Sequence, residues 1–185
     1  MPAKNNPVNR AVRIAFLSAL STTFAVAGFA ESIEEKIARA ITAAPAEITD
    51  DATILDVDLS VLRAGTNGWT CLPGVYLFRG NKSPMCNNAT WMKMMAANAA
   101  LEDFSAKSVG ISYMLAGDYI GTNAHPMANV PANGGVFVPA GARMMVLYPN
   151  MDEVADLPRD SKLGGPWVMW ADTPNAHVMI PIVAK

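Results

Sequence analysis

The chain has 185 residues, with 14 basic and 16 acidic side chains and a formal net charge of −2 at pH 7. Its length predicts one domain that is large enough to bury a normal hydrophobic core. The basic residues form no cluster of the kind that nucleic acids or anionic membrane surfaces attract, so the composition excludes both as expected partners.

The N-terminal 30 residues have the layout of a secretory signal peptide. Lys4, Arg10 and Arg13 precede a run of apolar and small residues that reaches Ala30, after which we expect cleavage. The predicted localisation is therefore periplasmic or secreted, with 31–185 as a single mature domain and no stable membrane insertion after cleavage.

Two alternatives to this cleavage remain open. Ala25 and Ala27 are also small, so the leader could end at Ala27. A run of about 17 apolar or small residues can also just span a bilayer as an uncleaved anchor. Cleavage after Ala30 removes three of the 14 basic residues and none of the 16 acidic ones, which leaves a formal balance of −5.

The first segment of the mature chain is typical of an amphipathic helix. Ile33, Ile37 and Ile41 are four residues apart and form one apolar stripe, with charged residues off it. The residue before a proline is biased away from helical backbone, so we expect the helix to cover 31–44 and to end before Pro45.

The next segment, "DDATILDVDLSVLRAGTNGWTC", is rich in β-branched residues and carries the turn signal "GTNG". It predicts a strand that leads into a turn or hairpin. Alternation along such a strand places Asp56 and Asp58 on one face and four residues on the other: Thr53, Leu55, Val57 and Leu59.

Cys71 and Cys86 are the two cysteines of the chain. An oxidising compartment favours a disulfide between them, which would close the loop 71–86 and stabilise the fold by about 3 kcal/mol. A metal site and a catalytic pair are the other interpretations. Their spacing is not the C-x-x-C of a redox pair, and no C-x-x-C-H haem attachment run is present.

A central helix is predicted over 89–104, where alanine and methionine predominate. Asn87 or Asn88 is the expected N-cap. The side that we expect to face the core carries Trp91, Met94, Met95, Asn98 and Leu101.

The remaining sequence has the texture of a β-sheet. Apolar runs of strand length are separated by Gly, Pro, Asn and Asp clusters; they lie at 109–118, 142–149, 166–171 and 177–184. A short helix is expected at 150–157, capped by Asn150. The predicted fold is a single α+β domain with a mostly antiparallel sheet, an N-terminal helix, a central helix and one disulfide.

The stretch "ILDVDLSVL" resembles the first motif of the haloacid dehalogenase-like phosphatases. The resemblance implies Asp56 as the nucleophile that attacks phosphorus, Asp58 as the general acid and base, and Asp118 as a ligand of magnesium. Leu59 stands where that family has glycine, and Lys107 lies too close to Asp118 for the family's conserved lysine. A metal-dependent, phosphatase-like hydrolase is therefore an alternative function.

A periplasmic copper-handling protein is a second alternative. The chain has twelve methionines and two histidines, and thioethers suit cuprous copper. His177 and Met179 would point to one face of the last strand, and His125 lies in a polar loop. Because methionines in apolar runs ordinarily fill core gaps, this function requires His125 or His177 to converge with at least two methionine sulfurs.

Three tryptophans lie in segments that contain Gly, Pro or Cys. Trp69, Trp167 and Trp170 predict an aromatic-lined pocket between the disulfide-closed loop and the C-terminal strands. The competing interpretation is that these large side chains fill a small core.

Four stretches together resemble a group of exported bacterial proteins of unknown function: "GTNGWTCLPG", "SPMCNNATWM", "GISYMLAGD" and "GGPWVMWADTPNAHVMIPI". The resemblance covers the chain from about Ala52 to its end and implies no reaction. We therefore predict a binding or structural module for a small molecule or a protein, leaning against an enzyme. No cofactor is expected, and the sequence assigns neither catalytic residues nor an oligomeric state.

Overall fold

The computed structural model describes Met1 and residues 31–75, 82–120 and 138–182, with the backbone alone for 118–120 and 138–140. The chain divides into two units, Met1–Ala30 and Glu31–Lys185, and the fold described below is that of the second. The signal segment lies outside the described residues and stays a prediction. In the part that is described, no helix is long and apolar enough to cross a bilayer.

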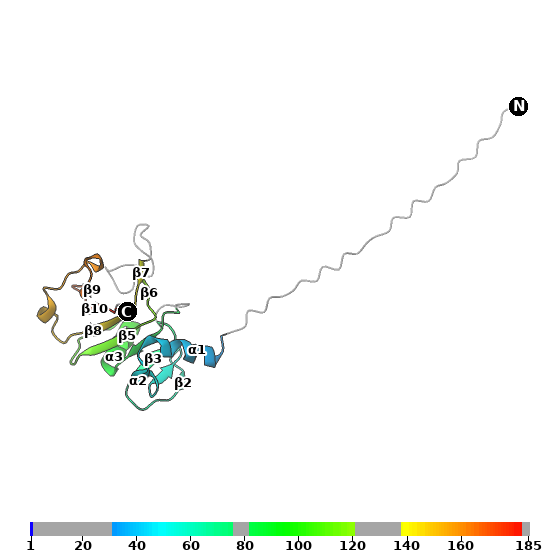
Figure 1. Ribbon diagram of the computed structural model, residues 1–185, viewed down its shortest axis with the longest axis horizontal. Coiled ribbons are helices and arrows are strands. Elements are labelled where there is room, and N and C mark those ends of the chain that lie inside the picture. Colours follow the sequence, from blue (N-terminus) through cyan, green and yellow to red (C-terminus); the bar gives the residue numbers. More distant parts are fainter. Residues whose placement is uncertain (2–30, 76–81, 121–137, 183–185) are drawn as a thin grey trace. The chain divides into compact units, whose positions relative to one another are not determined.

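Eight strands pair in one sheet, in the order β2-β1-β3-β4-β5-β8-β10-β9 (Figure 1). Within this sheet β1 and β3 run parallel, and the other neighbouring pairs run antiparallel. The predicted α+β fold with a mostly antiparallel sheet is thus confirmed. The strands are β1 (Thr53–Leu55), β2 (Val61–Arg63), β3 (Thr70–Leu72), β4 (Met85–Asn87), β5 (Gly110–Met114), β8 (Arg143–Leu147), β9 (Trp167–Met169) and β10 (His177–Pro181). A separate two-stranded sheet pairs β6 (Asp118–Ile120) with β7 (Val138–Ala140).

The predicted N-terminal helix forms as α1 (Ile33–Ala40), which continues as a 3-10 turn over Ile41–Ala43. Ser32 and Glu35 make a capping box, in which each side chain accepts a hydrogen bond from the other's backbone N–H, at 2.8 and 3.1 Å. A short α2 (Ala46–Thr49) follows Pro45. Later in the chain, 3-10 turns cover Met151–Val154, capped by Asn150, and Ser161–Leu163.

The central helix, α3 (Ala89–Ala100), is capped at its N-terminus by Asn88. The Asn88 side-chain oxygen accepts from the backbone N–H of Trp91 and of Ile111, both at 3.0 Å, so the cap also ties the helix to β5. The predicted end at 104 is wrong. The helix stops at Leu101, which adopts a left-handed backbone (φ 58°) and is 84% exposed instead of facing the core.

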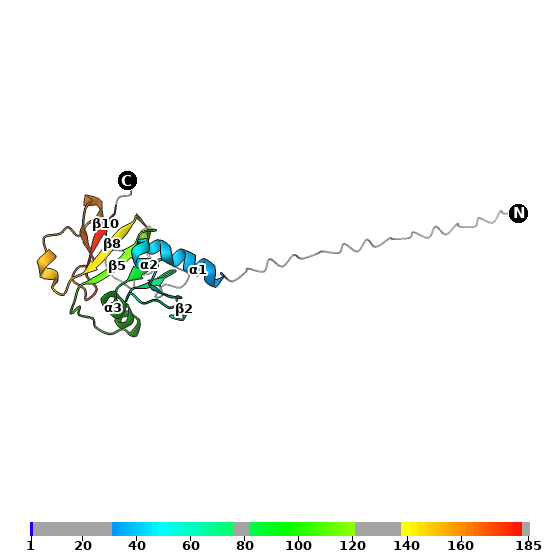
Figure 2. The ribbon, with the colours of Figure 1, turned by 60° about the horizontal axis from the view of Figure 1, so that its bottom comes forward.

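Each face of the large sheet carries its own core. One face packs against Trp91, Met94 and Met95 of α3; the strand residues of this core include Leu72, Met85, Met114, Met145, Leu147, Trp167, Met169 and Met179. The opposite face packs under α1 and its 3-10 extension, with Ala40, Ala43, Ala44, Ala52, Ile54, Cys71 and Cys86. Figure 2 shows β5, β8 and β10 side by side in the sheet.

The predicted alternation over 53–59 is wrong beyond Leu55. The chain turns at Asp56, where the backbone N–H of Leu59 donates to the carbonyl of Asp56 at 2.9 Å, and Leu59 has a φ of 68°. The chain then returns antiparallel as β2. The buried residue of β1 is Ile54, because Thr53 and Leu55 point away from the core beneath α1.

The predicted disulfide between Cys71 and Cys86 is confirmed. The two residues are direct partners in the β3–β4 ladder, with Cα atoms 4.0 Å apart, and both are fully buried. The covalent bond therefore fixes the register of two strands at the centre of the core beneath α1. Residues 76–81 of the closed loop lie outside the description.

Candidate functional site

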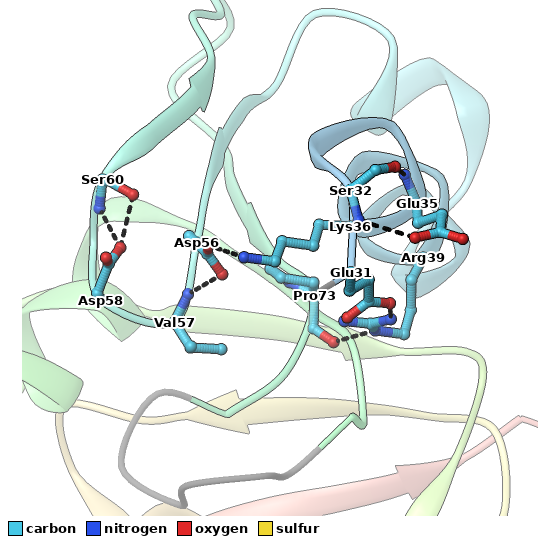
Figure 3. A network of polar contacts seen from close by, with 10 residues as sticks. All are labelled: Glu31, Ser32, Glu35, Lys36, Arg39, Asp56, Val57, Asp58, Ser60 and Pro73. Carbon is cyan, nitrogen blue, oxygen red and sulfur yellow. Dashed lines mark hydrogen bonds and ion pairs between the residues drawn. The ribbon is translucent and has the colours of Figure 1, made fainter. Parts of the chain in front are cut away.

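Asp56, the expected nucleophile of the hydrolase alternative, is held by an ion pair. Its carboxylate accepts from Lys36 of α1 and from the backbone N–H of its own neighbour Val57, the latter at 2.7 Å (Figure 3). The pair fastens α1 to the β1–β2 turn. It also raises the pKa of Lys36, chiefly through the hydrogen bond to Asp56.

Asp58 is exposed and stabilises the same turn. Its Oδ1 accepts from the Ser60 hydroxyl at 2.6 Å and from the Ser60 backbone N–H at 2.9 Å, and these two bonds lower its pKa (Figure 3). Asp118 lies on β6, where only the backbone is described. Among the described residues, no group of three His, Cys, Asp or Glu could hold a metal ion. The hydrolase alternative thus has no assembled site in that part of the chain.

The Lys36–Asp56 pair makes a testable prediction about stability. We expect Lys36→Met and Asp56→Asn each to lower the Tm, and the double variant to lose less than the sum. The reason is that either single change leaves one member of a partly buried pair without its opposite charge, whereas the double change leaves none. Thermal denaturation of the three variants measures this coupling.

The matched control is the ion pair between Arg159 and Asp172, whose side chains are 63% and 74% exposed. Water screens such a pair, so Asp172→Asn should leave the Tm nearly unchanged. Additive losses at Lys36 and Asp56 would contradict the proposed fastening of α1.

The three tryptophans of the expected pocket lie in two different cores. Trp69 packs beside Tyr113 in the core beneath α1, with ring centroids 5.7 Å apart. Trp167 and Trp170 belong to the core beneath α3. Successive residues of a strand face opposite sides of a sheet, and Trp69 precedes β3 on the Cys71 side. The structure therefore brings Trp167 and Trp170 together without Trp69.

His177 is contacted by one aromatic side chain of α3 and one of the C-terminal segment. It begins β10, is 1% exposed, and lies between two indole rings. The centroid of its ring is 5.2 Å from that of Trp91 and 5.0 Å from that of Trp170, and both contacts are edge-to-face, at 79° and 82°. We call Trp91, His177 and Trp170 the indole–imidazole cluster.

The imidazole of His177 is neutral at pH 7. Burial lowers its pKa to about 4, the positive charge of Arg143 acts in the same direction, and a hydrogen bond to Asn175 opposes them. His177 Nδ1 lies 2.8 Å from the carbonyl oxygen of Asn175. Because a carbonyl can only accept, Nδ1 carries the proton and Nε2 carries the lone pair.

Trp170 holds its place with a strained backbone. Its φ is 54°, in a region that costs a bulky residue on the order of 1–3 kcal/mol. Thr173 stabilises this conformation, because its backbone N–H and hydroxyl donate to the Trp170 carbonyl at 3.2 and 2.7 Å. Trp170 is half-buried, whereas His177 beneath it is buried.

Thioethers line the sheet around His177. Met169 of β9 is its direct cross-strand partner, and Met179 follows two residues later on the same face. Met145 of β8 is the direct partner of Met179. All three methionines are at least 94% buried in the core beneath α3.

Several buried polar atoms of this core have no hydrogen-bonding partner among the described residues: Trp91 Nε1, Asn87 Oδ1, Ser112 Oγ and Asn175 Oδ1. Asn87 and Ser112 are direct partners in the β4–β5 ladder. The Asn87 amide Nδ2 lies 3.5 Å from Met92 Sδ and 3.6 Å from Met95 Sδ. Unsatisfied buried polar atoms are costly, so this core contains polar groups that packing alone does not explain.

His177 and Trp170 were candidate site residues from the sequence, whereas Trp91 and Met169 were not predicted as their neighbours. The His-x-Met spacing at 177 and 179 was the available signal, and the pairing with Met169 requires knowledge of the strand order. His125 lies outside the described residues. No family model, curated protein or solved structure matches the chain.

Proposed function

We propose that this protein is an exported binding module and that its ligand site is the indole–imidazole cluster. The observation that carries the proposal is the position of His177, a fully buried neutral imidazole held between Trp91 and Trp170. A residue that only filled the core would need neither a polar ring nor an aromatic neighbour with a left-handed backbone. The formed disulfide agrees with export to an oxidising compartment.

The protonation state of His177 supports binding over acid–base catalysis. A general base works best when its pKa is close to the operating pH, whereas burial lowers the pKa of His177 to about 4. A neutral imidazole with a fixed tautomer is instead suited to donate a lone pair or to accept a hydrogen bond from a ligand.

Trp170 gives the site its entrance. It is the half-buried member of the cluster, and it sits in a turn that Thr173 stabilises locally. This turn lies directly before β10, which begins at His177. The ligand would therefore reach His177 past Trp170, between the turn and the sheet.

Thermal denaturation with chosen probes tests the proposal. We expect at least one of indole, phenol and silver nitrate, each at about 1 mM, to raise the Tm of the oxidised protein, since a ligand at 100 times its Kd stabilises by about 2.7 kcal/mol. The shift should be lost in Trp170→Ala and kept in Trp69→Phe, which changes an aromatic side chain of the other core. The proposal fails if no probe raises the Tm, or if Trp69→Phe abolishes the shift as Trp170→Ala does.

A further inference from the structure

We propose that the ligand of the indole–imidazole cluster is a soft monovalent metal ion, copper(I), bound by His177 Nε2 and the thioethers of Met169 and Met179. Met145 lies beside Met179 as a further thioether. This inference rests on the proposed binding function and names its ligand.

The register places these groups within reach of one ion. His177 and Met169 are direct partners in the antiparallel β9–β10 ladder, where Cβ atoms lie about 4.5–5.5 Å apart. Met179 is two residues along β10 on the same face. Methionine has three rotatable bonds beyond Cα, so its sulfur can turn toward a neighbouring side chain without moving the strand.

The hydrogen bond from Nδ1 to the Asn175 carbonyl completes a pattern that is common at metal sites. A ligating histidine usually donates its other ring N–H to a carboxylate or a backbone carbonyl, which fixes the tautomer and the orientation of the ring. Here that bond is 2.8 Å long and leaves Nε2 as the nitrogen that can bind an ion.

The chemistry of the donors selects the ion. Thioether sulfur is a soft, uncharged ligand that suits copper(I), whereas magnesium and calcium require oxygen ligands and structural zinc sites use thiolates, imidazoles or carboxylates. The charged group that acts electrostatically on the imidazole of His177 is the positive guanidinium of Arg143. That charge repels a divalent ion about twice as strongly as a monovalent one.

Arg143 makes contacts with groups outside the proposed ligand set. Its guanidinium donates to Met114 Sδ at 3.1 Å and to the Gly141 carbonyl at 3.3 Å. Met114 is the direct partner of Arg143 in the β5–β8 ladder, so the contact uses a different thioether from those of the proposed site. In the core beneath α3, Met114 thus contacts Arg143, whereas Met169 and Met179 are the proposed metal ligands.

Titration with silver(I), a redox-stable ion of the same charge and softness, tests the inference in chloride-free buffer without a reductant that could open the disulfide. We expect one silver ion per chain by native mass spectrometry and calorimetry. Met169→Leu and Met179→Leu keep a similar side-chain volume, so the fold should persist while the affinity falls by about tenfold or more. The matched control is Met94→Leu, a buried methionine of α3 outside the ligand set, which should keep the wild-type affinity.

The same titration is repeated anaerobically with copper(I) in competition with a chelator, and with zinc. Equal losses in Met94→Leu and Met169→Leu, or zinc binding as tight as copper(I), would overturn the inference. A protein that ignores silver and copper(I) but is stabilised by indole or phenol would overturn the copper assignment and leave the binding module standing. A protein that responds to no probe would overturn both.

Discussion

Trp91→Ala is expected to lower the free energy of unfolding by about 3–5 kcal/mol, the usual cost of deleting a large buried aromatic side chain. Trp91 is 3% exposed, lies in the first turn of α3, and its ring contacts His177. The substitution leaves a cavity between the helix and the sheet at the point where the site is built. Urea denaturation measures the effect as a fall in the midpoint at an unchanged slope.

Two further variants separate this effect from a general loss of aromatic side chains. Trp91→Phe keeps a ring against His177 and should recover more than half of the loss. Trp69→Ala removes a half-buried indole from the other core, where its partner is Tyr113, and should cost less than Trp91→Ala. Equal losses at Trp69 and Trp91 would contradict the central place that we give to Trp91.

The elements that could be predicted from the sequence are those with local causes. The capping box at Ser32 and the side chain of Asn88 determine where two helices begin, and both signals lie within four residues of the helix that they start. The disulfide could be predicted from the expected oxidising compartment and from the number of cysteines. With two cysteines in the chain, each has one possible intramolecular partner.

The errors arose where a non-local or a competing local interaction decides. A strand was expected to continue through Asp56, but the side chain and the backbone carbonyl of Asp56 both accept hydrogen bonds within a turn, and Lys36 pairs with it from a distant helix. Periodicity likewise placed Leu101 on the buried side of a helix that had already ended.

Only part of the candidate site could be predicted from the sequence, because some of its residues are distant along the chain. Trp170, His177 and Met179 are near one another in sequence, but Trp91 comes from α3, about 80 residues earlier, and reaches His177 because α3 covers the face of β10 that carries it. The strand order inserts β8 between β5 and β10, so the neighbours of His177 come from separate parts of the chain. Trp69 lies on the opposite face of the sheet from the other two tryptophans, because side chains alternate along β3. No local sequence pattern shows where β3 begins and therefore which face Trp69 takes.

Acidification should destabilise the protein between pH 6.5 and pH 4 through His177. Burial lowers the pKa of His177 from 6.5 to about 4 in the folded protein. Between these two pH values the imidazole is therefore mostly protonated in the unfolded chain and mostly neutral in the native state. Stability is therefore complete above pH 6.5 and falls as the pH approaches 4, by about 3 kcal/mol in total. Urea midpoints at half-unit intervals of pH from 7.5 to 4.5 measure the slope.

The pH range over which stability falls distinguishes the effect of His177 from the effects of the carboxylates. Hydrogen bonds and ion pairs lower the pKa values of Glu31 and Asp58 from 4.5 and 3.8, so their contributions are present above those values and are lost only at lower pH. The other histidine of the chain is His125, and His125→Gln should keep the slope. His177→Phe should remove it if the variant folds, and the native imidazole should show no NMR titration between pH 7 and pH 5. A native His177 that titrates near pH 6.5 would show that the ring is open to water, which would contradict its burial beneath Trp170.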